Sequence, residues 1–190
     1  MITSILQATQ ADAGTLKVDL EEVSLSVFLD DLKSNYQVLS GKELNLNWDY
    51  AAELPVVKTD GMKLKQILQN LIDNAIKFTQ KGTVTISAQV KEQAIEKRPQ
   101  PAEAPPHASR LAPHAIIEFK VADTGTGIPK EHLPIIFDKF RQIDSSETRV
   151  YGGAGLGLYL VKRFTEMLGG DVQVESEVGR GSTFTLSLPS

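Results

Sequence analysis

Two asparagines one helical turn apart are the first residues of this sequence whose types suggest chemistry. Asn70 and Asn74 share one arc of about 80° with Gln66 and Lys77 when residues 60–82 are drawn as a helix. Asn costs about half a kcal/mol relative to Ala inside a helix, so two of them in neighbouring turns need a reason. A solvated face is the ordinary reason. Two glycine-rich segments downstream favour a binding face instead.

The first of these segments is a carboxylate followed by two glycines, Asp123-Thr-Gly-Thr-Gly127. Asp123 stands at the end of an expected strand, where a carboxylate can accept a hydrogen bond from an exocyclic amine. Gly125 and Gly127 let the backbone pass close to a flat ligand. A plain strand-ending turn explains this motif equally well by itself. A calcium loop is excluded, because the alternating oxygen ligands and the terminal Glu are absent.

The second segment, Gly152-Gly-Ala-Gly-Leu-Gly157, opens an expected helix. Bare backbone amides at a helix N-terminus attract phosphates. A dinucleotide-binding fold would place such a run directly after a strand, whereas here a polar segment precedes it. A P-loop is excluded, because no Gly-Lys-Ser/Thr follows. Helix packing alone does not need four glycines in six positions, so the run favours a phosphate-binding loop.

Composition narrows the class of protein. The 190 residues include no cysteine, which excludes disulfides, thiolate metal sites and cysteine nucleophiles. The net charge of -4 provides no basic field for nucleic acid, although backbone amides can still bind an anionic ligand. No stretch approaches about 18 apolar residues, and no signal-peptide pattern opens the chain. We expect a cytoplasmic chain without direct membrane contact, standing alone or as the soluble part of a membrane-anchored sensor.

The helix expected over residues 60–82 must position the two asparagines. Thr59 or Asp60 can cap its start, and Gly82 stands where a left-handed stop is expected. Its other side is a continuous apolar stripe at helical spacing. The stripe consists of Leu64, Ile67, Leu68, Leu71, Ile72, Ala75 and Ile76.

The remaining pattern predicts an α+β fold. Expected strands cover residues 16–23, 44–48, 56–57, 83–90, 116–122, 171–176 and 182–188, and further helices cover residues 1–11, 130–140 and 156–168, with one more beginning after Ser24. Strands followed by strands favour a two-layer α/β sandwich, in which three principal helices cover one face of a mixed, mostly antiparallel sheet. Residues 92–115 hold five of the nine prolines and predict an exposed flexible loop.

Together these segments resemble the ATP-binding catalytic domain of sensor histidine kinases, which has the Bergerat-type fold shared with gyrase, chaperone and MutL ATPases. The resemblance covers residues 15–190, and residues 1–14 resemble the tail of the dimerisation helix and its linker. Five ordered blocks carry it: Asn70-Leu-Ile-Asp-Asn-Ala-Ile-Lys-Phe78, Asp123-Thr-Gly-Thr-Gly127, Phe137-Asp-Lys-Phe140, Gly153-Ala-Gly-Leu-Gly-Leu158 and Gly179-Arg-Gly-Ser-Thr-Phe184. Residues 141–157 then correspond to a mobile lid over ATP.

The resemblance implies a role for each matching residue. Asn74 would hold Mg²⁺ through its amide oxygen, and Asp123 would read the adenine amino group with Thr183 assisting by way of water. The implied catalytic residues are Asn70, Lys77 and Arg141, the last as a γ-phosphate contact. The implied nucleotide-binding residues are Asn70, Asn74, Lys77, Phe78, Asp123, Gly125, Gly127, Ile128, Phe140, Gly153, Gly155, Leu156, Gly157, Leu158 and Thr183.

Two features limit the chemistry that the resemblance implies. Asn70 stands where related ATPases carry a glutamate that activates water, and an amide is no general base at neutral pH. The only histidines are His107, His114 and His132, and none has the setting of a phosphoacceptor. We therefore expect a protein-histidine kinase catalytic domain that does not phosphorylate itself in isolation.

The expected function is to bind Mg-ATP and supply the γ-phosphoryl group to a histidine outside this chain. The implied partners are an upstream dimerisation domain that bears this histidine and the receiver domain of a response regulator, with no nucleic acid. Two alternatives keep the pocket: a nucleotide-binding interaction module without turnover, and a serine kinase or ATPase of the same superfamily. ATP binding cannot separate these functions, whereas an assay for phosphohistidine can.

Overall fold

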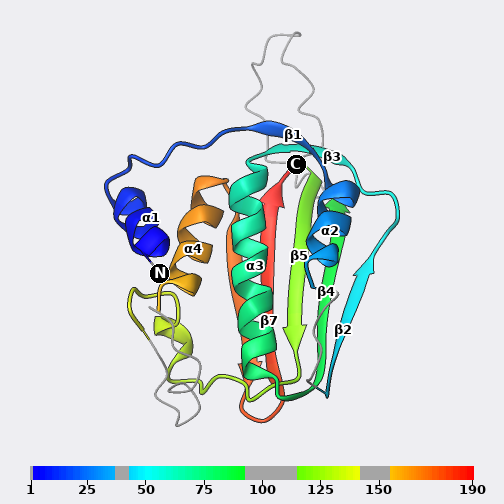
Figure 1. Cartoon of the computed structure of the whole chain (residues 1–190), viewed down its shortest axis with the longest axis vertical. Coiled ribbons are helices and arrows are strands. Elements are labelled where there is room, and N and C mark those ends of the chain that lie inside the picture. Colours follow the sequence, from blue (N-terminus) through cyan, green and yellow to red (C-terminus); the bar gives the residue numbers. More distant parts are fainter. Residues whose placement is uncertain (1, 37–42, 93–114, 142–154) are drawn as a thin grey trace, which may run out of the picture.

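A five-stranded sheet with helices on one face organises the chain (Figure 1). The computed structural model describes residues 2–36, 43–92, 115–141 and 155–190. The helices are α1 (Ile2–Asp12), α2 (Leu25–Ser34), α3 (Gly61–Phe78), α4 (Gly157–Met167) and the short 3-10 helix η1 (Leu133–Ile135). The strands are β1 (Glu21–Ser24), β2 (Glu43–Tyr50), β3 (Val56–Thr59), β4 (Lys81–Glu92), β5 (Ala115–Asp123), β6 (Asp171–Glu177) and β7 (Gly181–Pro189).

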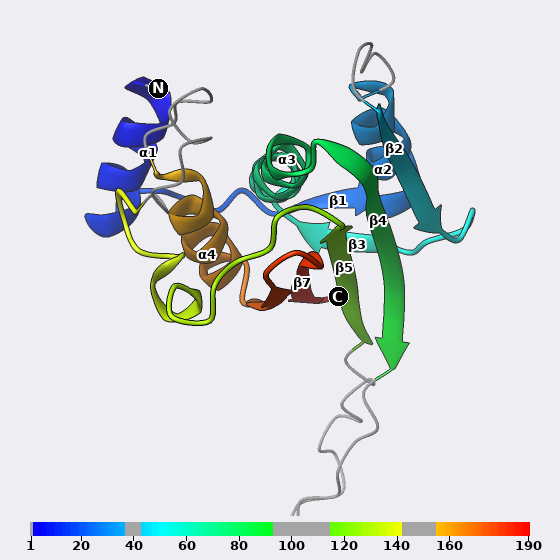
Figure 2. The ribbon, with the colours of Figure 1, turned by 90° about the horizontal axis from the view of Figure 1, so that it is seen from below.

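The strand order of the sheet is β2-β4-β5-β7-β6. β2 runs parallel to β4, and the other neighbours are antiparallel, as the prediction of a mixed and mostly antiparallel sheet requires. β1 and β3 form a separate antiparallel ribbon. Figure 2 shows α2, α3 and α4 on the same side of the sheet, so the predicted two-layer α+β fold is confirmed. The fourth helix, α1, lies beside α4.

The core lies between α3 and the covered face of the sheet. In the apolar stripe of α3, residues from Leu64 to Ala75 are at most 4% exposed, and Ile76 is partly buried. Asp60 caps the helix by accepting the Lys63 amide at 2.9 Å, as predicted. The stripe therefore fixes the rotation of α3, and this rotation keeps Asn70 and Asn74 half-buried at the edge of the core.

The prediction that α3 stops at Gly82 is wrong. The helix ends at Phe78, because Thr79 is already extended and leads directly into β4. Gly82 lies inside β4 with φ +134°, where a Cβ would stand 2.2 Å from Thr124 Oγ1. Close approach of the loop after β5 therefore explains this glycine, and a helix stop does not.

Two other predicted elements are shorter than expected. Of residues 16–23, only those from Glu21 onward form a strand, because the partner β3 is four residues long. The helix expected over residues 130–140 is reduced to η1. Pro134 has no amide hydrogen for an α-helical bond, and the segment ends with Phe140 at φ +57°.

None of the helices in the described part of the chain has both the length and the apolar character needed to cross a membrane.

Candidate functional site

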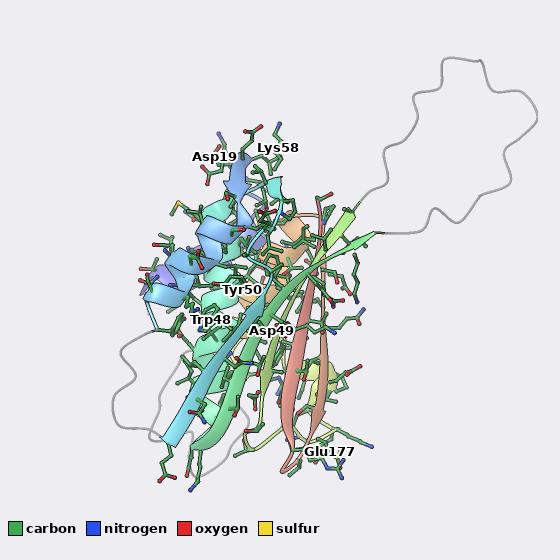
Figure 3. All side chains as sticks on the ribbon, turned by 90° about the vertical axis from the view of Figure 1, so that its right-hand side faces the viewer. Asp19, Trp48, Asp49, Tyr50, Lys58 and Glu177 are labelled. Atoms are coloured by element: carbon green, nitrogen blue, oxygen red, sulfur yellow. The ribbon has the colours of Figure 1, made fainter. Side chains whose placement is uncertain are left out.

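The end of the sheet farthest from the β1–β3 ribbon brings the predicted site residues together. Figure 3 shows Glu177, at the end of β6, far from Asp19 and Lys58 at the opposite end of the molecule. β5 ends and β7 begins at this end of the sheet, and Asp123 pairs there with Ser182. α3 runs alongside β5 and β7, and its C-terminal half lies toward the same end of the sheet (Figure 1).

The loop after β5 packs so closely on its neighbours that it requires glycines. At Gly125 a Cβ would lie 2.3 Å from the carbonyl oxygen of Phe78, and at Gly127 it would lie 2.1 Å from that of Glu177. The amide of Thr126 also donates to Phe78 O at 3.2 Å, and Gly179 N donates to Thr126 O at 2.8 Å. The loop is therefore held between the end of α3 and the β6–β7 turn, which fixes the position of Asp123.

Asp123 is a half-buried carboxylate that accepts backbone hydrogen bonds. Its Oδ1 accepts the Gly125 amide at 2.8 Å, and the Ser182 amide donates to the same carboxyl group. Burial raises the pKa of Asp123, and the two amide bonds only partly offset that effect. A carboxylate held in this way keeps its remaining lone pairs for a donor such as an amine.

The polar face of α3 meets the start of α4. Asn70 Nδ2 donates to Gln66 O at 2.9 Å, and Asn70 Oδ1 lies 3.1 Å from the place of a Cβ on Gly157. A side chain at the first position of α4 would require Asn70 to shift by a few tenths of an ångström. Lys77 Nζ stands 5.1 Å from the centroid of the Phe78 ring. The two predicted amides and the predicted cation thus follow one side of the helix.

The two ends of the predicted lid lie against each other. The Phe140 amide donates to Gly155 O at 3.0 Å, and a Cβ on Gly155 would stand 2.8 Å from Arg141 O. The Arg141 side chain is exposed, with Nε 4.0 Å from Asp138 Oδ2. Leu156 is buried, and Ile128 and Leu158 pack partly on the core. Residues 142–154, including Gly153, lie outside the described residues, as do residues 93–114 with His107 and His114.

Thr183 does not lie on the face of the sheet that carries Asp123, as its predicted role requires, whereas Ser182 does. Thr183 pairs with Ala122, so its side chain lies on the face of the sheet opposite to Asp123. Ser182 pairs with Asp123 and is 7% exposed. Alternation along β7 carries the signal that sequence reasoning missed: Phe184, Leu186 and Leu188 face the core, so residue 182 shares their face.

A second missed residue is Thr79, whose side chain is fully buried. Its Oγ1 has no hydrogen-bond partner within the described ranges, and it would lie 2.8 Å from a Cβ on Gly125. An unpaired buried hydroxyl beside a bare glycine and a buried carboxylate fits a flat ligand with polar edges. The described part of the chain contains no group of three or more His, Cys, Asp or Glu side chains that could hold a metal. A single amide such as Asn74 fits a metal ion that brings anionic ligands of its own.

Comparisons with known proteins agree with this geometry. The model of the histidine kinase-, DNA gyrase B- and HSP90-like ATPase family matches residues 59–190. The chain is 33% identical over its whole length to the autoinducer 2 sensor kinase/phosphatase LuxQ of Vibrio vulnificus, and 33% identical over 99% of its length to the aerobic respiration control sensor protein ArcB of Escherichia coli. It spans 20% and 22% of the length of these two relatives.

Among solved structures, the chain resembles full-length ShkA in complex with AMPPNP. The TM-score is 0.75 at 28% identity, over 99% of this chain and 35% of that one. The catalytic domain of the histidine kinase ThkA gives a TM-score of 0.67 at 20% identity, over 90% of this chain and 95% of that one. The second likeness concerns the fold alone.

Proposed function

We propose, from the premise that this chain belongs to the histidine kinase-, DNA gyrase B- and HSP90-like ATPase family, that it binds Mg-ATP and supplies the γ-phosphoryl group to a histidine outside the chain. One observation carries the proposal. A half-buried acceptor, Asp123, stands in a glycine-cradled loop at the same edge of the sheet as the amide face of α3. The loop suits the base, and the amide face suits the phosphates.

In this site Asp123 accepts the amino group of adenine, and Phe78 and Ile128 line the base. Phe78 is 37% exposed at the end of α3, so its ring is available to a ligand. The Ile128 amide is tied to Ser176 Oγ at 2.8 Å, which holds the residue beside the Asp123 loop. The selectivity for adenine follows from Asp123, because an ionised carboxylate can only accept.

The phosphates lie between α3 and the N-terminus of α4. The backbone amides of Gly155 and Gly157 and the positive end of the α4 dipole attract them. Asn74 would hold Mg²⁺ through its amide oxygen, and the ion would neutralise charge on the triphosphate. Lys77 and Arg141 supply further positive charge, and Gly153, Leu156, Leu158 and Phe140 complete the lid side.

The acceptor is proposed to be an imidazole on a dimerisation domain, followed by the receiver domain of a response regulator. Asn70 gives water no general base, so hydrolysis is slow and transfer to a positioned nucleophile is favoured. Of the three histidines only His132 lies in the described residues, half-buried at the start of η1. ATP as the phosphoryl donor places the reaction in the cytoplasm, whether or not the parent sensor is membrane-anchored.

The direct test uses radiolabelled ATP with the chain alone and with an added histidine-bearing dimerisation domain. We expect Mg-dependent ATP binding, no label on the chain, and acid-labile label on the added domain. Binding without any label in the presence of several such domains would favour a nucleotide-binding interaction module. Acid-stable label on serine would favour the serine kinase alternative. Stable, acid-labile label on the isolated chain would contradict the proposal.

A further inference from the structure

The five-stranded sheet has two outer strands, β2 and β6, and the outer edge of β2 has no neighbour among the described strands. Figure 1 places β2 at one side of the molecule, and Figure 3 looks onto that side with β2 in the foreground. Neither proline nor lysine interrupts the strand from Glu43 to Tyr50. Such an edge presents unpaired backbone N–H and C=O groups, which are a template for another strand.

The side chains of β2 alternate between the two faces of the sheet. Trp48 lies on the helix side, where its ring centroid is 6.3 Å from that of Tyr36, and the Tyr50 hydroxyl donates to Asp30 of α2 at 2.7 Å. The apolar row on this side is partly buried and consists of Leu44, Leu46, Trp48 and Tyr50. The exposed row on the other side consists of Glu43, Asn45, Asn47 and Asp49. A partner strand therefore needs the same alternation of apolar and polar residues.

β2 itself has this alternation, so a second copy of the chain meets the requirement. Two copies of the strand related by a two-fold axis perpendicular to the sheet run antiparallel, and residues that pair point to the same face. A register centred on Leu46 sets Glu43 of each copy against Asp49 of the other, which is unfavourable because like charges face each other. A register centred on Asn47 sets Asn45 against Asp49, so no like charges face each other. Charge therefore selects the second register.

The same register also pairs the apolar side chains. Leu46 stands opposite Trp48 of the other copy, and Leu44 stands opposite Tyr50. Contact between large side chains on facing strands stabilises an antiparallel pair. These side chains are only partly buried in the single chain, so pairing would remove more of their apolar surface from water. The backbone edge, the apolar row and the polar row thus favour one arrangement.

The outer strand at the opposite side of the sheet, β6, is not complementary to itself. A register centred on Val174 sets Asp171 against Glu177, and one centred on Gln173 sets Asp171 against Glu175. A register centred on Glu175 sets that residue against its own counterpart. Charges of one sign along an outer strand oppose pairing with another copy. Self-pairing is therefore a property of β2 and not of both outer strands.

We propose that the outer edge of β2 pairs antiparallel with β2 of a second copy, about a two-fold axis at Asn47. The pairing joins two five-stranded sheets into one continuous sheet. A single pair of strands buries less surface than a standard protein–protein interface, so the dimer is weak and reversible. The candidate site lies at the ends of β5 and β7, so the dimer does not depend on the proposed function.

The test is the oligomeric state of the chain and of charge variants in the exposed row. Asn45→Lys sets opposite charges against each other at two symmetric places and should strengthen the dimer by about 2- to 30-fold. Asn45→Asp sets like charges against each other there and should weaken it by a similar factor. Asn47→Lys sets two lysines against each other at the axis and should weaken it by about 2- to 5-fold. Gln173→Lys makes the same change of net charge on β6 and should leave association unchanged.

Sedimentation velocity over a concentration series up to the millimolar range measures the association constants, and urea unfolding checks that every variant is folded. A wild-type chain that stays monomeric over this range would overturn the inference. Equal effects of Asn45→Lys and Asn45→Asp would overturn it as well, because the register requires effects of opposite sign. Assemblies that grow beyond a dimer would indicate pairing of β2 with β6 and would also contradict it.

Discussion

At the scale of single residues, ionisation of the Asp123 carboxyl group lowers the stability of the fold but creates the group proposed to bind the ligand. Burial raises its pKa, which means that the folded state binds its proton more tightly than the unfolded chain does. As pH rises through the unfolded and then the folded pKa, this group costs stability. The same ionisation creates the acceptor proposed to bind an amino group, so the site keeps a charge that the fold alone would not favour.

Asp123→Asn should therefore lower affinity for ATP without lowering stability. Its side-chain oxygen still accepts the Gly125 amide, but half of the group now donates. We expect the ATP affinity to fall about tenfold or more, as for a hydrogen bond to a charged group. The free energy of unfolding at pH 7 should equal or exceed that of the wild type, and any gain should disappear below the pKa of Asp123. A large loss of stability at pH 7 would contradict this view of the carboxyl group.

Asn74→Ala tests the proposed metal ligand on α3. Ala is the better helix former by about half a kcal/mol, so the fold should be retained. The gain in ATP affinity on adding Mg²⁺ should shrink by about ten- to hundredfold, the range for losing a contact to a charged group. Gln69→Ala changes an amide on the same helix outside the proposed site and should leave the Mg²⁺ effect intact. Calorimetry with Mg²⁺ and with EDTA measures the difference, and an unchanged metal dependence would rule out Asn74.

The sequence predicted the structural roles of single residues correctly only where the neighbours within one segment were enough to decide them. Asp60 as the helix cap and the buried stripe of α3 follow from local spacing, and both are confirmed. The face on which Thr183 lies follows from its pairing with Ala122, and Thr79 is recognisable only by its burial beside Gly125. The positions of such residues depend on their neighbours in other strands, so the spacing within one motif cannot predict them.

At the scale of elements, α3 is held at its start by a buried ion pair. Lys63 Nζ lies 2.6 Å from Asp60 Oδ2 and donates to Lys17 O at 2.7 Å, and Asp60 Oδ2 also accepts the Asp19 amide at 3.0 Å. Both side chains are almost inaccessible to solvent. The pair joins the helix to the segment before β1. The Asp19 amide and the Lys17 carbonyl are bound there by side chains of α3 and its cap instead of by a neighbouring strand.

Lys63→Met should destabilise the protein strongly, because it leaves the buried Asp60 without its cation. Breaking a buried pair in this way costs about 3 to 5 kcal/mol of unfolding free energy. Lys65→Met is the matched control, since Lys65 pairs with Asp31 at the surface and should cost at most about 1 kcal/mol. Burial acts to raise the pKa of Asp60, but the hydrogen bonds from Lys63 and from the Asp19 amide outweigh it and lower the pKa, so their contribution to stability is present above the unfolded pKa and is lost as pH falls. Urea unfolding of both variants at pH 7 provides the comparison. Equal losses of unfolding free energy would contradict the structural role given to the buried pair of Lys63 and Asp60.

At the scale of the whole molecule, α1 connects to both ends of the predicted lid. Asp12, the last residue of α1, forms hydrogen bonds with Lys139, just before the lid, and with Tyr159 in the first turn of α4 after it. Arg163 Nη2 donates to Ala11 O at 3.3 Å, and Ala8 and Ala11 are buried. Helix α1, which the sequence predicts to be the tail of a dimerisation helix, thus packs against α4. Sequence spacing could not reveal this contact, because its residues lie more than 120 positions apart.

Asp12→Asn tests whether that charge holds α1 in place. The Lys139 and Tyr159 hydrogen bonds lower the pKa of Asp12, so its contribution is present at neutral pH and is lost as pH falls through the lowered pKa. Because Asp12 and Lys139 are both substantially exposed, salt should weaken their attraction. In Asp12→Asn the amides of α1 should therefore exchange hydrogen faster, whereas those of β5 and β7 should be unchanged. High salt should reproduce the effect in the wild type. Glu177→Gln removes the partner of Arg180 at the turn between β6 and β7 and should leave exchange in α1 as it is. Unchanged protection of α1 in Asp12→Asn would mean that the buried alanines alone hold the helix.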